Sequence, residues 1–299
     1  MRLDNFLRRQ LKSVPKSFVY KIIRSGEVRV NRGRVRPSTR VAAGDQIRLP
    51  PLRTRSQTAG PEKPRPPDNM IERATSAIIS EAPDYLLMDK PPDMAVHAGS
   101  GVDFGLIECL RAARPNEYLE LAHRLDRGTS GALLVARSQP ARRQLAEALA
   151  DPRARKTYLA LLDGHWPDEV TRVNQPLNPS AEFSGQARVR VDSTHGKTAT
   201  SEFRVIARSG SATLVKVDIL TGRKHQIRAH AAYFDCPVAG DGRYGDSKRA
   251  TGWRRQGLKR PFLHAFRLQI PRGGGWLTAE VTLADDLERV MQYIGLTNV

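Results

Sequence analysis

The sequence predicts an α+β protein in which a small cationic domain is joined by a proline-rich linker to a larger domain with a mainly antiparallel sheet. Two observations predict this division: most of the excess charge lies in the first 60 residues, and six prolines lie between residues 50 and 67. A series of strand-like segments with few helices between them predicts the antiparallel sheet. The 299 residues suffice for about two domains. We place the small domain at 1–57, the linker at 58–75 and the large domain at 76–299.

The charge is concentrated near the N-terminus. The chain carries 49 Lys and Arg residues against 31 Asp and Glu, a formal charge of +18. Residues 1–60 hold fifteen of the basic residues and three acidic ones, a net of +12. Such an excess favours a polyanionic partner, most often a nucleic acid. A merely solvated basic surface is the alternative, although charge runs of that kind are usually interspersed with acids.

Composition excludes several classes of protein. The sequence has no run of about 18 apolar residues, so we expect no membrane-spanning helix. The first twelve residues are charged throughout and lack the apolar segment of a signal peptide, which indicates a cytoplasmic protein. The two cysteines, Cys109 and Cys236, are too few for a disulfide framework or a structural zinc site.

The small domain is expected to hold two short helices and a hairpin. Apolar residues recur at helical spacing over 3–11 and 19–23, and the second pattern ends at Gly26. Residues 28–35 alternate apolar and basic side chains around a turn, and 45–49 adds a strand. The basic residues gathered on the second helix and the hairpin, expected to contact nucleic-acid phosphates, are Lys16, Lys21, Arg24, Arg29, Arg32, Arg34 and Arg36.

The large domain is expected to begin with a hairpin at 78–90. Because most of the later strands follow one another directly, the sheet should be mainly antiparallel. These strands are expected at 132–137, 157–164, 187–193, 200–208, 212–220, 262–270 and 276–283, and helices at 103–113, 139–150, 224–234 and 285–294.

The motifs of common cofactor sites are missing from the sequence. No GxGxxG follows a predicted strand and no GxxxxGK[ST] is present, so we expect neither a dinucleotide nor a nucleoside triphosphate. His225 and His230 are five residues apart, which does not fit the HExxH zinc pattern, and no GxSxG indicates a serine nucleophile. We therefore expect no cofactor and no metal.

One segment, 121–138, concentrates polar side chains before an apolar strand. Asp126 lies there between Arg124 and Arg127, and the two guanidiniums are expected to keep its carboxylate ionised at neutral pH. Glycines at 128 and 131 would let the backbone approach a bulky partner. On these residues alone a salt-bridged turn is the more common explanation, because structural ion pairs are frequent.

Four ordered motifs and a closing strand, however, resemble those of the RluA family of pseudouridine synthases. HRLDRGTSG at 123–131 resembles the catalytic signature, MDKPPDMAVHAGSG at 88–101 the first motif, and KTYLALLDG at 156–164 the tyrosine motif. LTGRKHQIRAHAAYFDCPVAGDGRYG at 220–245 is similar to the third motif, and FLHAFRLQIP at 262–271 to the closing strand. The large domain is thus expected to be a pseudouridine synthase catalytic domain.

The resemblance implies catalytic roles for three residues. Asp126 would be the nucleophile or base that breaks the glycosidic bond of a uridine, whose uracil then turns and rejoins through carbon. Arg228 would pair with Asp126 and keep it charged and oriented. Tyr158 would stack on the uracil and take part in a later proton transfer. One acid suffices because the isomerisation consumes no water, unlike glycoside hydrolysis.

Four more residues are implied as substrate contacts: Arg124, His123, Arg127 and Ile227. Arg124 would enter the RNA helix where the extruded base had been. Ile227 would pack against the base, and His123 is expected mainly to shape the turn. The other histidines expected to be hydrogen-bonded structural groups, or at most phosphate contacts, are His97, His225, His230 and His264.

Residues 2–37 resemble the S4 RNA-binding domain, so the two resemblances cover nearly the whole chain. Together they imply a monomeric, cofactor-free enzyme that converts uridines of large-subunit ribosomal RNA to pseudouridine, with the S4 domain tethering it to RNA. A sister enzyme acting on other ribosomal or transfer RNA uridines is one alternative. A catalytically idle RNA-binding assembly factor is another.

The chain departs from the family pattern at two positions. Asp93 stands where the first motif usually has glycine, so we expect an altered backbone in that loop. Gly128 stands where a larger polar residue is usual, and we expect it to loosen the catalytic loop.

Overall fold

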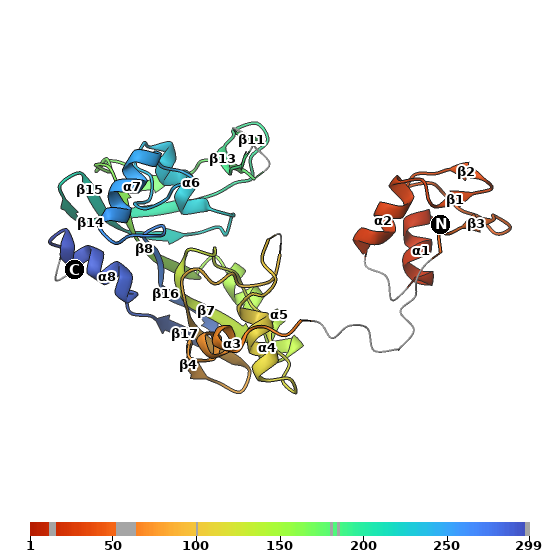
Figure 1. Ribbon diagram of the computed structural model, residues 1–299, viewed down its shortest axis with the longest axis horizontal. Coiled ribbons are helices and arrows are strands. Elements are labelled where there is room, and N and C mark those ends of the chain that lie inside the picture. Colours follow the sequence, from red (N-terminus) through yellow and green to blue (C-terminus); the bar gives the residue numbers. More distant parts are fainter. Residues whose placement is uncertain (12–15, 52–63, 100, 180–181, 184–185, 297–299) are drawn as a thin grey trace. The chain divides into compact units, whose positions relative to one another are not determined.

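The computed structural model describes residues 1–11, 16–51, 64–99, 101–179, 182–183 and 186–296, in two units that comprise residues 1–65 and 66–299 (Figure 1). The boundary between the units falls inside the segment 58–75 that the sequence predicts as linker. Residues 68–75 form a helix, α3 (Asp68–Thr75), whose Ile71 and Ala74 are buried in the core of the larger unit. A helix there is compatible with the prolines because they precede its first turn, where a missing N–H is tolerated.

The smaller unit packs two helices against a three-stranded sheet. Helix α1 (Leu3–Gln10) and α2 (Lys16–Arg24) bury one apolar face each, and Tyr20 Oη of α2 donates to Asp4 Oδ2 of α1 at 2.9 Å. The antiparallel strands lie in the order β2-β1-β3. Their bounds are β1 (Arg29–Val30), β2 (Gly33–Arg34) and β3 (Ile47–Arg48). Asn31 and Arg32 both have positive φ, as the two-residue turn of a twisted hairpin requires.

The larger unit is built on a ten-stranded sheet with the order β4-β5-β7-β16-β8-β15-β14-β9, with β17 paired to β16 and β6 to β7. All neighbours are antiparallel except β7 and β16, which confirms the mainly antiparallel sheet that the sequence predicts. The strands are β4 (Ile78–Glu81), β5 (Tyr85–Lys90), β6 (Glu120–Leu121), β7 (Ser130–Ala136), β8 (Arg155–Asp163), β9 (Arg172–Val173), β14 (Ser201–Ser209), β15 (Ala212–Ile219), β16 (Leu263–Arg272) and β17 (Gly275–Glu280).

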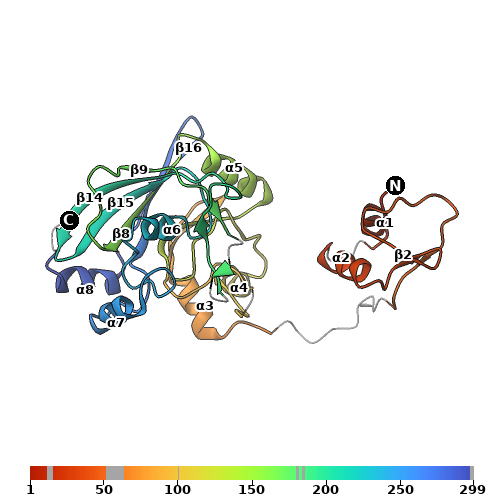
Figure 2. The same ribbon diagram turned by 90° about the horizontal axis from the view of Figure 1, so that it is seen from above.

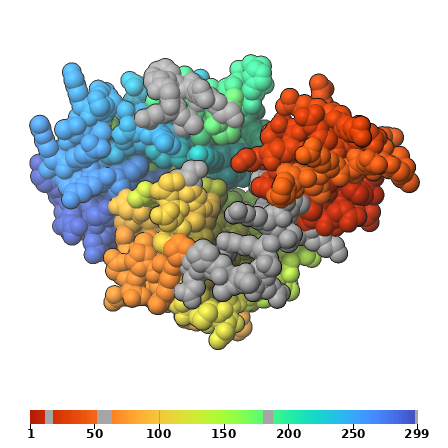
Figure 3. All heavy atoms as spheres, turned by 45° about the vertical axis from the view of Figure 1, so that its right-hand side comes forward, coloured from red at the N-terminus to blue at the C-terminus, as the bar shows by residue number. Residues whose placement is uncertain are grey.

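Helices cover both faces of this sheet. Every residue of β7 is buried: Ala132 and Leu134 pack toward α5 (Gln139–Ala150), whereas Leu133 and Val135 pack toward α3 and α4 (Leu106–Ala113). Figure 2 shows α5 on the side of the sheet away from α3 and α4, and in Figure 3 the orange and yellow parts of the chain, which include α3 and α4, adjoin on the surface. The other helices are α6 (Gln226–Tyr233), α7 (Ser247–Arg255) and α8 (Asp285–Tyr293).

The single strand predicted at 187–193 is present only as two short pieces. β12 (Gln186–Ala187) pairs with β11 (Glu182–Phe183), and β13 (Arg190–Val191) pairs with β10 (Leu177–Asn178). The backbone between β12 and β13 leaves the ladder because the Val189 N–H donates to Tyr244 Oη at 3.1 Å. A donor engaged by a side chain cannot also bond a neighbouring strand.

Two helices, α3 and α7, escaped the sequence analysis. Helix α3 follows two prolines, and α7 buries only Ala250 and Trp253 among mainly charged residues. None of the helices in the described part of the chain has the length and hydropathy needed to span a bilayer.

The parallel contact of β7 with β16 requires a glycine. Gly131 pairs with Ala265 and has φ +109°, and a Cβ there would lie 2.3 Å from the Ala265 carbonyl oxygen. Neither the backbone conformation nor the space permits a side chain.

We expect Gly131→Ala to lower the free energy of unfolding by at least about 2 kcal/mol, because a methyl group would both strain the backbone and overlap a neighbouring strand. Urea denaturation followed by circular dichroism measures this change. Gly252→Ala, in helix α7 with no atom within 4 Å of the added Cβ, is the matched control and should be neutral or stabilising. Equal effects of the two substitutions would contradict the prediction.

Candidate active site

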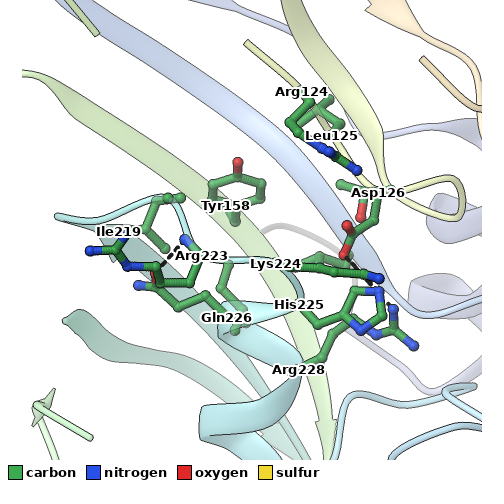
Figure 4. Close-up of a pocket in the computed structure, with 14 residues that line it drawn as sticks. Arg124, Leu125, Asp126, Tyr158, Ile219, Arg223, Lys224, His225, Gln226 and Arg228 are labelled. Carbon is green, nitrogen blue, oxygen red and sulfur yellow. Dashed lines mark hydrogen bonds and ion pairs between the residues drawn. The ribbon is translucent and has the colours of Figure 1, made fainter. Parts of the chain in front are cut away.

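Asp126, Tyr158 and Arg228 line one cavity of about 250 Å³ (Figure 4). The volume is below the roughly 300–1,000 Å³ of pockets for drug-sized ligands and suits a single nucleoside. Asp126 lies in the loop between β6 and β7, Tyr158 on β8, and Arg228 in the first turn of α6. Of the sequence-predicted substrate contacts, Arg124 and Ile227 also line the cavity.

Strand register brings Tyr158 beside the loop between β6 and β7 that carries Asp126, here called the catalytic loop. In β16, Ala265 pairs with Tyr158 of β8 on one side and with Gly131 of β7 on the other. Because the loop that carries Asp126 ends where β7 begins, this register places the loop next to the tyrosine. Side chains 32 residues apart in the sequence therefore meet across three neighbouring strands.

The buried Arg260 holds the catalytic loop by hydrogen bonds to its Gly128 and to Ser130, where β7 begins. Arg260 is 3% exposed; its Nη1 donates to the Gly128 carbonyl at 3.1 Å and its Nη2 to Ser130 Oγ at 3.0 Å. A bidentate pair with Asp286 of α8, at 2.7 and 2.8 Å, compensates the buried charge. A Cβ at position 128 would lie 3.1 Å from Cδ of Pro261. The expected loosening of the loop at Gly128 is therefore wrong: the glycine lets the loop pack tightly.

A buried lysine holds the same loop from the other side. Lys90 at the end of β5 is 0% exposed, and its Nζ donates to the carbonyls of Pro91 at 2.7 Å, Met94 at 2.8 Å and Arg127 at 3.2 Å. Burial and the nearby Arg260 lower the pKa of Lys90 to about 7. The ammonium joins the first-motif loop, 91–94, to the catalytic loop.

Asp93, where the sequence analysis expects an altered backbone, instead adopts a conformation that suits glycine. Asp93 has φ +63°, in the left-handed region that glycine favours and that aspartate tolerates better than most residues. Its carbonyl accepts a hydrogen bond from Arg127 Nε at 3.0 Å. The loop closes with the aspartate in the conformation that suits glycine.

The Asp126 carboxylate lies in a place that disfavours its charge. Its side chain is 22% exposed, and Arg228 Nη1 lies 3.8 Å from Oδ2. Burial raises the pKa of Asp126, and the opposing effects of Arg228, Arg124 and Lys224 do not cancel that rise. Only one of the two guanidiniums that flank Asp126 in the sequence acts on its carboxylate, because Arg127 turns away toward Asp93, and burial outweighs the remaining cations.

Arg228 is held by a residue that the sequence analysis did not single out. Asp241, whose side chain is 1% exposed, accepts from Arg228 Nε at 2.6 Å and from Nη2 at 2.8 Å. Burial disfavours the guanidinium charge, but the two carboxylates outweigh burial and raise the pKa of Arg228. The guanidinium also lies over the Tyr244 ring, 4.9 Å from its centroid. Asp241 and Tyr244 belong to the GDGRYG stretch of the third motif, which was the available signal.

Two predicted substrate contacts do not line the cavity. His123 turns back to β7, where its Nε2 accepts the Leu134 N–H at 3.1 Å, and burial lowers its pKa to about 4. It shapes the turn, as expected, but does not reach the substrate space. Arg127 instead bonds the first-motif loop. The sequence analysis missed the cavity-lining roles of Arg223, Lys224 and His225, which immediately precede α6.

The basic residues of the smaller unit lie largely on its surface. Lys21, Arg24, Arg32 and Arg34 are exposed, Arg29 is half-buried, and the side chain of Lys16 lies outside the described residues. Arg34 Nη2 donates to the Arg24 carbonyl at 3.2 Å, linking the hairpin to the end of α2. Among the residues described in either unit, no three His, Cys, Asp or Glu side chains come together as a metal ion requires.

Comparison with known proteins identifies the class to which this fold and cavity belong. The profile of the RNA pseudouridylate synthase family matches residues 84–233, and that of the S4 domain matches residues 1–47. The chain belongs to the RNA pseudouridylate synthase family and is an isomerase with an N-terminal S4 domain.

Relatives resemble the chain over nearly its full length. It is 44% identical over 298 residues to ribosomal large subunit pseudouridine synthase C of Escherichia coli K12, covering 98% of this chain and 92% of that protein. The enzyme of the same name from Haemophilus influenzae is 41% identical, covering 98% and 91%. Among solved structures, human RNA pseudouridylate synthase domain containing 1 is 26% identical with a TM-score of 0.56, covering 74% of this chain and 95% of that one.

Asp241→Asn should lower the free energy of unfolding by about 3 kcal/mol, because it leaves the buried Arg228 guanidinium without its full countercharge. Urea denaturation measures this loss. The matched control is Asp151→Asn, since Asp151 pairs with Arg153, whose side chain is 68% exposed, and surface pairs contribute little. The prediction fails if both variants unfold at the same urea concentration as the parent protein.

Proposed function

We propose that this chain isomerises specific uridines of large-subunit ribosomal RNA to pseudouridine, with Asp126 as the catalytic aspartate. The observation that supports this most is the convergence of Asp126, Tyr158 and Arg228 on a cavity of nucleoside size. The names of its relatives supply the substrate class. The enzyme is further proposed to act in the cytoplasm as a monomer without a cofactor.

The reaction needs one carboxylate and no water. Asp126 promotes cleavage of the bond between C1′ and uracil N1, as nucleophile or base; the uracil turns in the cavity, and its C5 bonds C1′. The C5 proton is lost and N1 is protonated, so atoms balance within the nucleoside. Arg228 Nη1, 3.8 Å from Asp126 Oδ2, stabilises the carboxylate that the first step requires.

Tyr158 enters this reaction as a neutral phenol. Burial and the neighbouring Asp126 carboxylate both raise its pKa, so the hydroxyl keeps its proton at neutral pH. A phenol offers an aromatic face for the uracil and a hydroxyl that can donate a hydrogen bond. Stacking is therefore its primary proposed role, and base catalysis by a phenolate is disfavoured.

The nucleotide must leave its stack to reach the cavity. Exposed cations at the rim, Arg124, Arg223 and Lys224, are proposed to hold the displaced phosphate backbone. Arg124 lies next to Leu125 and Asp126 on the catalytic loop, so it can occupy the space that the base vacates. The S4 domain is proposed to add further phosphate contacts through its own basic surface.

Asp126→Asn should abolish pseudouridine formation while RNA affinity stays within about threefold, because the amide keeps the shape but cannot act as nucleophile or base. Tritium release from [5-³H]uridine-labelled ribosomal RNA measures the reaction, and filter binding measures affinity. Asp103→Asn, at an exposed position, is the control and should keep the parent rate. Release by the parent protein from transfer RNA but not ribosomal RNA would favour the sister enzyme. Absence of release from either would favour an assembly factor.

The S4 surface should contribute to affinity and not to chemistry. Replacing Lys21 and Arg32 by Gln should raise KM for a ribosomal RNA fragment about tenfold, leave kcat unchanged and reduce the slope of log affinity against log salt by about 2. The control replaces Arg142 and Arg143 by Gln; both are exposed on α5, which packs on the face of the sheet opposite to Tyr158. An unchanged salt slope would contradict the assignment of this surface to RNA.

A further inference from the structure

His225 has a conformation that its place in α6 does not explain. It is the N-cap residue, yet its side chain makes no capping hydrogen bond, and its backbone lies in the left-handed region with φ +51° and ψ +26°. Such a conformation is strained for a non-glycine residue and persists only where surrounding contacts enforce it. The His225 side chain is 8% exposed and lies between two groups: it is hydrogen-bonded to Tyr244 on one side and faces Asp126 on the other.

Tyr244 determines which nitrogen of the imidazole carries the proton. Tyr244 Oη accepts the Val189 N–H at 3.1 Å and lies 3.0 Å from His225 Nδ1. Burial and four surrounding cations lower the pKa of His225 to about 3, so the ring is neutral and carries one proton. Burial raises the pKa of Tyr244 to about 12, so its hydroxyl keeps a proton to donate. One arrangement satisfies the Val189 N–H, the Tyr244 hydroxyl and the His225 imidazole together. In it the Tyr244 hydroxyl donates to Nδ1, and the ring proton lies on Nε2.

The Nε2 atom points at the proposed catalytic carboxylate. It lies 3.9 Å from Asp126 Oδ2, the same oxygen that Arg228 Nη1 approaches at 3.8 Å, and Figure 4 shows both side chains directed toward Asp126. Arg228 has Nε and Nη2 engaged by Asp241, so only Nη1 faces Asp126. Two donors from one helix end therefore converge on one carboxylate oxygen.

We propose that His225 is a positioning residue that donates its Nε2–H to Asp126 Oδ2 when a nucleoside fills the cavity, with Tyr244 holding the imidazole in the required tautomer. The contact must shorten by about 1 Å to become a hydrogen bond. Oδ2 is then anchored by His225 and Arg228, and Oδ1 is the oxygen that faces the reacting nucleoside. This inference rests on the proposed function of Asp126.

A neutral donor suits this place better than another cation. The charged or titratable groups that face Asp126 are Arg124 from its own loop, Lys224 and Arg228 around the start of α6, Asp241 after α6, Lys90 from β5 and Tyr158 from β8. The cations already favour the ionised carboxylate. A hydrogen bond from the uncharged imidazole adds orientation and stabilises the carboxylate without withdrawing as much of its nucleophilicity as a further full charge would.

The first test replaces His225 by Asn, because asparagine tolerates the left-handed backbone but cannot reach Asp126. Single-turnover rates of pseudouridine formation at saturating ribosomal RNA are measured from pH 5 to pH 9. Without the donor the pKa of Asp126 should rise further, so the acid limb of the profile should move up by about one pH unit. The plateau rate should fall about 10- to 100-fold, with RNA affinity within about twofold.

The second test uses Tyr244→Phe, which keeps the ring beneath the Arg228 guanidinium and removes the hydroxyl that sets the tautomer. It should shift the acid limb in the same direction. Because Tyr244 acts through His225, the double variant should be no slower than His225→Asn alone. Tyr118→Phe, at an exposed tyrosine, is the matched control and should keep the parent profile.

Outcomes separate this inference from the proposed function. A parent protein without turnover overturns both. Turnover by the parent with an unchanged pH profile in His225→Asn overturns the positioning role alone, as do independent, multiplicative losses from His225→Asn and Tyr244→Phe. Circular dichroism and thermal unfolding of each variant measure the folded fraction, and a loss of rate that only tracks that fraction would assign His225 a purely structural role.

Discussion

The active cavity depends on one buried ion pair, between Arg228 and Asp241. Burial works against the charge of Asp126, so the proposed chemistry requires a cation whose place does not change. An arginine tethered only by its flexible stem would lose most of its rotamer freedom to stay there. The bidentate bond to Asp241 fixes the guanidinium plane and leaves Nη1 facing Asp126. The rest of the site is arranged around that fixed charge.

Two further buried basic side chains hold the loop that carries Asp126. Lys90 donates to the carbonyl of Arg127, and Arg260 donates to the carbonyl of Gly128. These are successive carbonyls directly after Asp126, approached from β5 and from the segment before β16. Buried carbonyls need donors, and buried cations need acceptors, so each satisfies the other. Held by Lys90 and Arg260, the loop leaves the Asp126 carboxylate open to the cavity.

The sequence analysis succeeded where patterns are local. The predicted helix at 139–150 matches α5 because its apolar spacing lies within the segment itself, and the structure adds a cap at Ser138, the residue directly before it. The predicted strand at 132–137 matches β7 closely, since a continuous apolar run is typical of a strand buried on both faces. The strand predicted at 187–193 is interrupted because its backbone donor at Val189 bonds Tyr244, 55 residues away, and α7 escaped because only Ala250 and Trp253 are buried. Such long-range contacts leave no periodic pattern of apolar residues in the sequence.

The sequence by itself determined the two-domain division, the mainly antiparallel sheet and, through four ordered motifs, the family and its candidate acid, tyrosine and arginine. Only the tertiary structure decided that burial raises the pKa of Asp126, which residues reach its carboxylate and which turn away. Charge pairs and burial depend on distances between segments far apart in the chain, and neighbours in sequence need not be neighbours in space. Arg127 adjoins Asp126 in the chain and points elsewhere, whereas Arg228, about a hundred residues away, supplies the nearest guanidinium.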